Sequence, residues 1–185
     1  MRIISGSFKG KKILEPSDAV TRPLKDLTKE SIFNILTHSN KFKINIEKSV
    51  ILDLFSGVGS FGIECLSRGV KKVIFVEKYV GVLPILKKNL SNLKLENNYE
   101  ILEKNIYDES TFLIFKNKFD IIFLDPPYKD KNINFLIEQI IEKKILKKTG
   151  IILIHRHKKD DIEITSKLNI LDTRKYGISK IIIGN

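Results

Sequence analysis

The chain of 185 residues, 42% hydrophobic and 30% charged, has the size and composition of one globular domain with a full core. No apolar run approaches the roughly 20 residues that span a bilayer, no signal-peptide pattern opens the chain, and the single cysteine excludes an intrachain disulfide. We therefore expect a cytoplasmic protein without membrane contact, and the formal charge of +11 favours a polyanionic partner such as a nucleic acid.

Residues 1–48 are expected to form an N-terminal extension. Two short extended runs, residues 2–5 and 11–14, flank a loop with two glycines and predict a β-hairpin, and a helix is predicted over residues 24–37. Residues 1–29 hold seven basic and three acidic side chains, so positive charge is concentrated there. We expect an arm that contacts RNA phosphates, with a merely solvated surface as the alternative. The expected RNA-binding residues are Arg2, Lys9, Lys11, Lys12, Arg22 and Lys25.

From residue 49 onward, predicted strands and helices alternate. Strands are predicted at 50–55, 72–76, 99–102, 119–124 and 151–155. A turn at 57–62 is predicted to open a helix that continues to residue 68, and further helices are predicted at 79–93, 109–115 and 133–146. An antiparallel pair, 168–176 and 178–183, closes the chain around Gly177. Such alternation predicts an α/β fold with a doubly wound, mostly parallel sheet of seven strands, and we assign residues 49–185 to a catalytic domain.

A glycine-rich turn follows the first of these strands. Residues 57–62 fit GxGxxG between a strand and a helix, and Glu77 follows Gly57 by twenty residues, which is the fingerprint of dinucleotide binding. A nicotinamide-dependent dehydrogenase is therefore one interpretation. Against it, Asp53 lies four residues before Gly57 and puts negative charge where a pyrophosphate prefers helix N–H groups alone.

The same turn suits S-adenosylmethionine better. This ligand has no phosphate, and its ammonium, carboxylate and sulfonium groups suit an acidic residue beside backbone that can be approached closely at glycines. Glu77 can accept both ribose hydroxyls, while Asn105 and Ile106 can meet the adenine; the alternative is that Glu77 only caps a helix. We expect no metal. The expected cofactor-binding residues are Asp53, Phe55, Ser56, Gly57, Gly59, Glu77, Lys78, Asn105, Ile106 and Asp125.

The fourth strand ends in Asp125, Pro126, Pro127 and Tyr128, the expected catalytic residues. Proline has no N–H and a fixed φ, so the turn is stiff and its carbonyls are expected to have no local donors. A carboxylate, a proline carbonyl and an aromatic ring can together hold the exocyclic amine of a nucleobase. The alternative is a proline-bounded loop in which Asp125 is only a turn residue.

Taken together, these tracts resemble the RsmD family, methyltransferases that act on N2 of one guanine in bacterial 16S ribosomal RNA. The resemblance rests on residues 2–6, 9–10, 16, 22–23, 26, 30, 33–34, 53–64, 66–69, 125–128 and 175–177. It implies a class I methyltransferase (Rossmann-like) fold, S-adenosylmethionine as donor, and 16S RNA in a partly assembled small ribosomal subunit as substrate; we expect a monomer. A DNA adenine-N6 methyltransferase and a non-catalytic RNA-binding assembly factor remain as alternatives.

One tract departs from the family pattern. After the fifth strand the chain has His155, Arg156 and His157, where the family often has an acidic residue. No third metal ligand is evident at a suitable spacing. We expect these histidines to be exposed to solvent or to face RNA.

Overall fold

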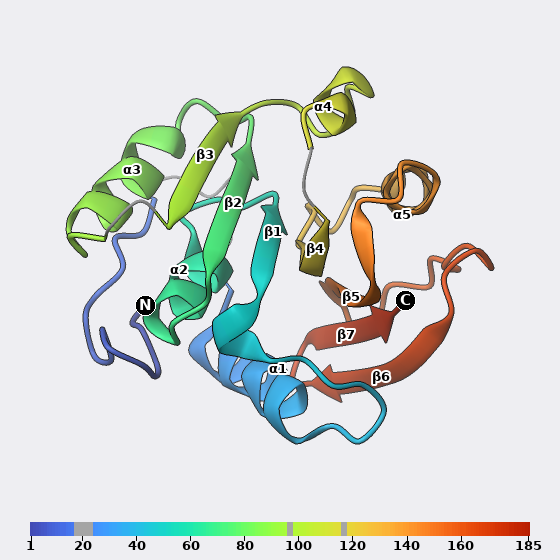
Figure 1. Ribbon diagram of the computed structural model, residues 1–185, viewed down its shortest axis with the longest axis horizontal. Helices are drawn as coiled ribbons and strands as arrows, with labels where there is room; N and C mark the ends of the chain where they lie inside the picture. Colours follow the sequence, from blue (N-terminus) through green and yellow to red (C-terminus); the bar gives the residue numbers. More distant parts are fainter. Residues whose placement is uncertain (17–23, 96–97, 116–117) are drawn as a thin grey trace.

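The computed structural model, which describes residues 1–16, 24–95, 98–115 and 118–185, has a seven-stranded sheet at its centre (Figure 1). The strand order is β3-β2-β1-β4-β5-β7-β6. β1 to β5 are paired in parallel, and β7 is antiparallel to both β5 and β6. The strands are β1 (Val50–Leu54), β2 (Lys72–Glu77), β3 (Tyr99–Glu103), β4 (Phe119–Leu124), β5 (Leu146–His157), β6 (Ile170–Tyr176) and β7 (Ser179–Gly184). The predicted doubly wound, mostly parallel sheet and its closing antiparallel pair are confirmed.

Helices cover both faces of the sheet (Figure 1). They are α1 (Asp26–His38), α2 (Ser60–Ser67), α3 (Leu83–Ser91), α4 (Ser110–Leu113) and α5 (Ile133–Glu142), with a short 3₁₀ turn η1 (Ile46–Lys48). Because side chains alternate along a strand, Ile51 and Leu153 pack with α1, α2 and α3, and Leu52 and Ile154 pack with α4 and α5. No helix within the described ranges is both long and apolar enough to cross a bilayer.

Two predicted helices were too long. The helix predicted over 79–93 begins at Leu83, and Pro84 lies in its first turn, where the missing N–H removes no hydrogen bond. The helix predicted over 133–146 ends at Glu142, because Lys144 has a φ of 54° and Leu146 already pairs with Phe119. β5 is therefore much longer than predicted, since sheet pairing overrides the local helical pattern.

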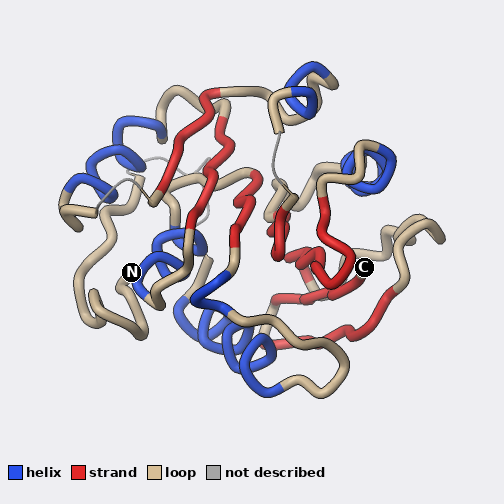
Figure 2. Tube along the Cα trace, viewed as in Figure 1, coloured by secondary structure: helices blue, strands red, loops and turns tan. Residues whose placement is uncertain are grey.

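The N-terminal segment folds back on itself less regularly than the predicted hairpin. One antiparallel bridge joins Arg2 and Lys12, and the Gly10 N–H bonds the Ile3 carbonyl (2.9 Å). The segment is drawn as loop in Figure 2. Ile3 and Ile13 are buried in the cluster that also contains the core residues of α1 and α2, so residues 1–48 and the sheet share one hydrophobic core.

Candidate active site

The strand register brings several predicted site residues to one edge of the sheet. Leu54 of β1 pairs with Val76 of β2 and with Leu124 of β4. The residues that follow these three therefore lie side by side, because the strands are parallel. They are Phe55, Glu77 and Asp125. The glycine turn and the proline turn, separated in sequence, thus share the carboxyl edge.

The glycine turn is held in a left-handed backbone conformation. Phe55, Gly57 and Gly59 have φ angles of 60°, 54° and 85°, which glycine adopts at little cost. The Ser56 hydroxyl is buried and donates to the carbonyl oxygens of Asp53 (2.9 Å) and Val76 (3.0 Å). The turn is therefore tied to both strands beneath it.

Asp53 is a buried carboxyl group just below this turn. Its Oδ2 accepts the Gly62 N–H (3.0 Å), which ties β1 to the first turn of α2. Burial raises the pKa of Asp53 well above its usual range; the Gly62 N–H opposes this, while the negative charges of Asp125 and Glu77 add to it. Across the described residues, no group of three or more His, Cys, Asp or Glu side chains is placed to hold a metal ion.

Glu77 closes β2 and binds backbone N–H groups. Oε2 accepts from Gly57 (2.8 Å), and Oε1 accepts from Lys78 (2.9 Å) and Tyr79 (2.8 Å). A carboxylate has about four acceptor sites, and these three N–H groups occupy three of the sites on Glu77. The Lys78 side chain is exposed.

Two further predicted cofactor-binding residues, Asn105 and Ile106, lie just after the end of β3. Ile106 is buried, whereas Asn105 is exposed and its Oδ1 accepts the Tyr107 N–H (3.2 Å). The Tyr107 ring lies 5.8 Å from the Phe55 ring, measured between centroids. Tyr107 therefore joins the segment after β3 to the glycine turn, a link that the sequence did not predict.

The proline turn is stiffened by more than its prolines. The expectation that its carbonyls lack local donors is wrong for Pro127, whose carbonyl accepts from the Asp130 N–H (2.8 Å) and from Arg156 Nη1 (3.2 Å). No group in the described part of the chain donates to the Pro126 carbonyl. Pro126 is buried, and Tyr128 is half-buried. Of the two proline carbonyls, that of Pro126 is therefore the one without a donor among the described residues.

The expectation that the histidines after the fifth strand are exposed is wrong for His155. His155 and the intervening Arg156 are buried, and His157 is half-buried. His155 Nδ1 lies 2.7 Å from Asp125 Oδ1, and its Nε2 lies 2.9 Å from Ser179 Oγ. The reason is that β5 continues to His157 as an inner strand of the sheet, paired with β7 along its last six residues.

The predicted RNA-binding residues of the arm that lie within the described ranges are all exposed. They are Arg2, Lys9, Lys11, Lys12 and Lys25, whereas Arg22 lies outside the described residues. Ser60, the first residue of α2, donates to the Leu24 carbonyl (3.3 Å) and to Met1 Sδ (3.1 Å). The start of the chain and the start of α1 therefore lie beside the glycine turn. The loop after Gly6 instead contacts Ser67, about 10 Å along α2.

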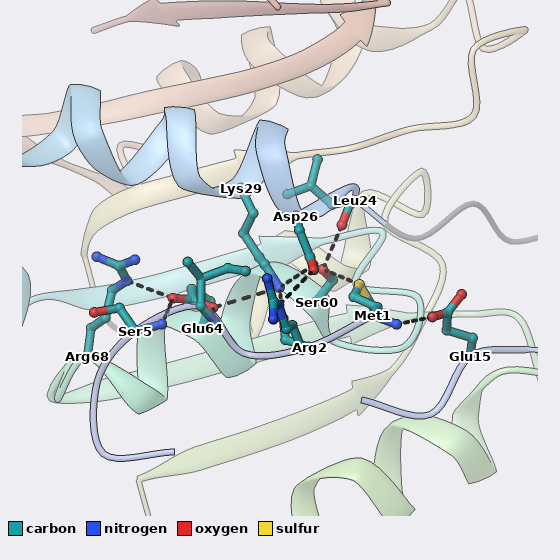
Figure 3. Close-up of polar contacts among 11 residues, drawn as sticks. Met1, Arg2, Ser5, Glu15, Leu24, Asp26, Lys29, Ser60, Glu64 and Arg68 are labelled. Atoms are coloured by element: carbon teal, nitrogen blue, oxygen red, sulfur yellow. Dashed lines mark hydrogen bonds and ion pairs between the residues drawn. The ribbon is translucent and has the colours of Figure 1, made fainter. Parts of the chain in front are cut away.

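A buried charged cluster, which the sequence analysis did not assign, holds this arm in place (Figure 3). Glu64 is fully buried and accepts the N–H groups of Ile4 (2.8 Å) and Ser5 (3.0 Å) as well as Arg68 Nε (2.9 Å). Lys29 Nζ lies 3.7 Å from Glu64 Oε2 and donates to the Arg2 carbonyl (2.6 Å). Glu64 therefore binds the N–H groups of two consecutive residues of the N-terminal segment.

Comparison with known proteins gives one family. The sequence matches the family described as Conserved hypothetical protein 95 over residues 1–185. It is 32% identical over 179 residues to the Ribosomal RNA small subunit methyltransferase D of Haemophilus influenzae, covering 96% of this chain and 90% of that protein. A crystal structure from Haemophilus influenzae has a TM-score of 0.74 and 32% identity, covering 99% of this chain and 96% of that one. A more distant structure, solved as a complex with SAH (S-adenosylhomocysteine), has a TM-score of 0.65 and 17% identity, covering 86% of this chain and 50% of that one. The chain therefore belongs to this family, with the class I methyltransferase (Rossmann-like) fold, and the predicted RsmD assignment is confirmed.

Proposed function

We propose that the protein transfers a methyl group from S-adenosylmethionine to the exocyclic N2 amine of a guanine in 16S ribosomal RNA. The observation that carries the proposal is the juxtaposition of the glycine turn and the Asp125 turn at one edge of the sheet, fixed by the pairing of Leu54 with Val76 and Leu124. A donor and an amine held at these two turns lie next to each other. The name of the Haemophilus influenzae relative supports ribosomal RNA as substrate.

The residues present fit S-adenosylmethionine. Asp53 and Asp125 supply carboxyl groups near a cationic ligand, and the bare backbone of Gly57 and Gly59 permits close approach. Glu77 keeps about one acceptor site for a ribose hydroxyl. To bind both hydroxyls, it must release one of its backbone N–H partners. The neighbouring structure solved with SAH supports the same ligand class.

The Asp125 turn fits an aromatic amine. His155 engages Oδ1 of Asp125, which leaves Oδ2 to accept one amine hydrogen, while the free Pro126 carbonyl accepts the other. The Tyr128 ring can stack on the base. With both hydrogens bound, the nitrogen lone pair is directed away from the turn.

The chain's own residues act by positioning and by electrostatics. S-adenosylmethionine, when bound, supplies an electrophilic methyl group on its sulfonium. Asp125 and Pro126 hold the weakly nucleophilic guanine amine in line and favour the pyramidal nitrogen on which positive charge develops. As the new N–CH3 bond forms, the S–CH3 bond breaks and would leave a neutral thioether. The amine proton becomes acidic only then and can pass to the Asp125 carboxylate that accepts it, so no strong base is needed before attack. An unstacked base in a single-stranded loop is the least costly substrate.

A methyl-transfer assay with labelled donor tests the proposal. Wild type should label 16S RNA, presented naked or in a partly assembled small subunit, and Asp125→Ala should lose at least 100-fold in kcat/KM because an amine-orienting contact is gone. Asp161→Asn, which changes an exposed carboxylate, is the matched control. Mass mapping should find N2-methylguanine. Label on duplex DNA would favour the adenine-N6 alternative, and no label on any nucleic acid would favour the non-catalytic assembly factor.

We also propose that the N-terminal arm, residues 1–48, contacts RNA phosphates beside the site and that the enzyme works as a cytoplasmic monomer. Lys11 and Lys12 are exposed, so reversing both charges should weaken RNA binding and lower the slope of log K against log salt by about 0.7 for each lost single-strand phosphate contact. The matched control reverses Lys143 and Lys148, which are also exposed but lie where α5 ends and β5 begins. Equal RNA affinities for the two double variants would rule out the arm's role.

A further inference from the structure

The end of β5 contacts the Asp125 turn with consecutive side chains. His155 bonds the Asp125 carboxylate, Arg156 bonds main-chain carbonyls of the turn, and the His157 ring lies 5.3 Å from the Tyr128 ring. Because side chains alternate on a strand, His155 lies on the sheet face that α1 covers and Arg156 on the face that α5 covers. The turn is therefore held from both sides of the sheet.

His155 is fixed at both ring nitrogens. A carboxylate can only accept, so Nδ1 carries the proton donated to Asp125 Oδ1 at 2.7 Å. In the neutral ring, Nε2 then accepts from the Ser179 hydroxyl at 2.9 Å, and Ser179 Oγ in turn lies 3.2 Å from Thr28 Oγ1. These hydrogen bonds fix the imidazole ring of His155 in a single orientation. The consequence is that one oxygen of Asp125 is held and the other is directed away from His155.

Arg156 holds the backbone of the same turn. Only 1% of its surface is exposed, and such burial requires that its N–H groups be satisfied. Nη1 donates to the Pro127 carbonyl (3.2 Å), Nη2 donates to the carbonyls of Tyr128 (3.0 Å) and Asp130 (2.8 Å), and Nε pairs with Asp160. These bonds hold three main-chain carbonyls that follow Pro126.

We propose that His155 and Arg156 are positioning residues for methyl transfer: His155 orients the Asp125 carboxylate, and Arg156 fixes the main chain of the turn. The inference rests on the proposed function, since it assigns to this tract the alignment of the amine. A catalytic group needs such support to stay within a fraction of an ångström of its working position. Misplacement by about 1 Å can cost roughly 100-fold in rate.

His155 offers the sharper test, because removal of the buried Arg156 side chain takes a donor from three main-chain carbonyls and the ion-pair partner from Asp160, which threatens folding. His155→Leu keeps a buried side chain of similar size without an N–H, whereas the amide nitrogen of His155→Asn stands near the position of Nδ1 and can still donate to Asp125. We expect kcat for RNA methylation to fall about 10- to 100-fold in the leucine variant, with KM for S-adenosylmethionine unchanged. The asparagine variant should recover most of that loss. Ser179→Ala should lie between wild type and His155→Leu.

The outcomes separate this inference from the proposed function. An active wild type with an unchanged leucine variant would overturn the role of His155 and leave the proposed function standing. Equal kcat losses in the leucine and asparagine variants, together with parallel losses in melting temperature and cofactor KM, would show a purely structural role and also overturn it. A wild type that transfers no methyl group would overturn the proposed function, and the inference with it.

Discussion

Replacing Glu64 with glutamine should destabilise the protein far more than the same change at Glu100. The two carboxylates differ in burial and in number of partners. Glu100 forms a surface pair with Lys72 at 2.9 Å, in which the side chains are 47% and 34% exposed. Glu64 and Lys29 lie farther apart, at 3.7 Å, but both side chains have 0% exposure. Distance alone would rank the surface pair as the stronger.

The expected magnitudes follow from burial. An exposed pair contributes at most about 1 kcal/mol, so Glu100→Gln should cost less than that. Breaking a buried pair costs roughly 3–5 kcal/mol, because it leaves an uncompensated charge. We expect Glu64→Gln to cost about 3 kcal/mol, at the low end of that range, because one amide oxygen remains to accept the Ile4 or Ser5 N–H. Burial already lowers the pKa of Lys29, against the opposing effects of Glu64 and Asp26.

Equilibrium unfolding in urea measures the free energy of unfolding of both variants. The two values can be compared directly if the m-value is unchanged. Lys29→Met gives a second check. It should cost less than Glu64→Gln, since Glu64 keeps its two backbone partners and Arg68. If Glu64→Gln lost no more stability than Glu100→Gln, burial would not be the deciding quantity, and the cluster would not be what anchors the N-terminal segment.

Three further predictions concern the cofactor side of the site. Affinity for S-adenosylmethionine should rise as pH rises through the raised pKa of Asp53, because only the ionised carboxylate attracts a cation. Calorimetry should find no such rise in Asp53→Asn. A wild-type affinity that does not depend on pH would contradict this prediction. Gly62→Ala should cost about 1–3 kcal/mol of stability, because its Cβ would meet the Phe75 ring at 2.3 Å, and a wild-type urea midpoint would refute it. Glu77→Gln should lower the free energy of unfolding by about 1.5–3 kcal/mol, because an amide nitrogen cannot accept the Gly57 N–H. Its affinity for S-adenosylmethionine should fall too. An affinity equal to that of wild type in calorimetry would show that Glu77 does not bind the cofactor.

The first four strands show how much local pattern can predict. Each is a short apolar run bounded by turn residues, and each was placed within one or two residues of its observed ends. The same holds for the motif residues that follow them, since a residue directly after a strand must lie at that strand's edge. Glycine and proline chemistry predicted the two turns for the same reason.

The end of β5 shows where local pattern fails. The run before Ile151 is rich in lysine and follows a helix without a strong stop signal, so the helix is predicted to continue to residue 146 and residues 147–150 are assigned to neither helix nor strand. Pairing of Leu146 with Phe119 of β4 and of residues 152–157 with β7 extends the strand at both ends and places His155 on the sheet face that α1 covers. Whether a histidine is exposed depends on which elements pack over it, and the spacing of residues along the sequence does not reveal this.

From the amino-acid sequence alone follow the alternation of strands and helices, the two turns at the carboxyl edge and the family they resemble, because these depend on neighbouring residues and on side-chain periodicity. Only the tertiary structure decided that Lys29 meets Glu64, that His155 meets Asp125, and that Arg156 serves the proline turn. Each of these contacts joins segments far apart in the chain. Charged and polar groups at such distances meet only when packing of the apolar core brings their elements together, and burial then determines how strongly they interact.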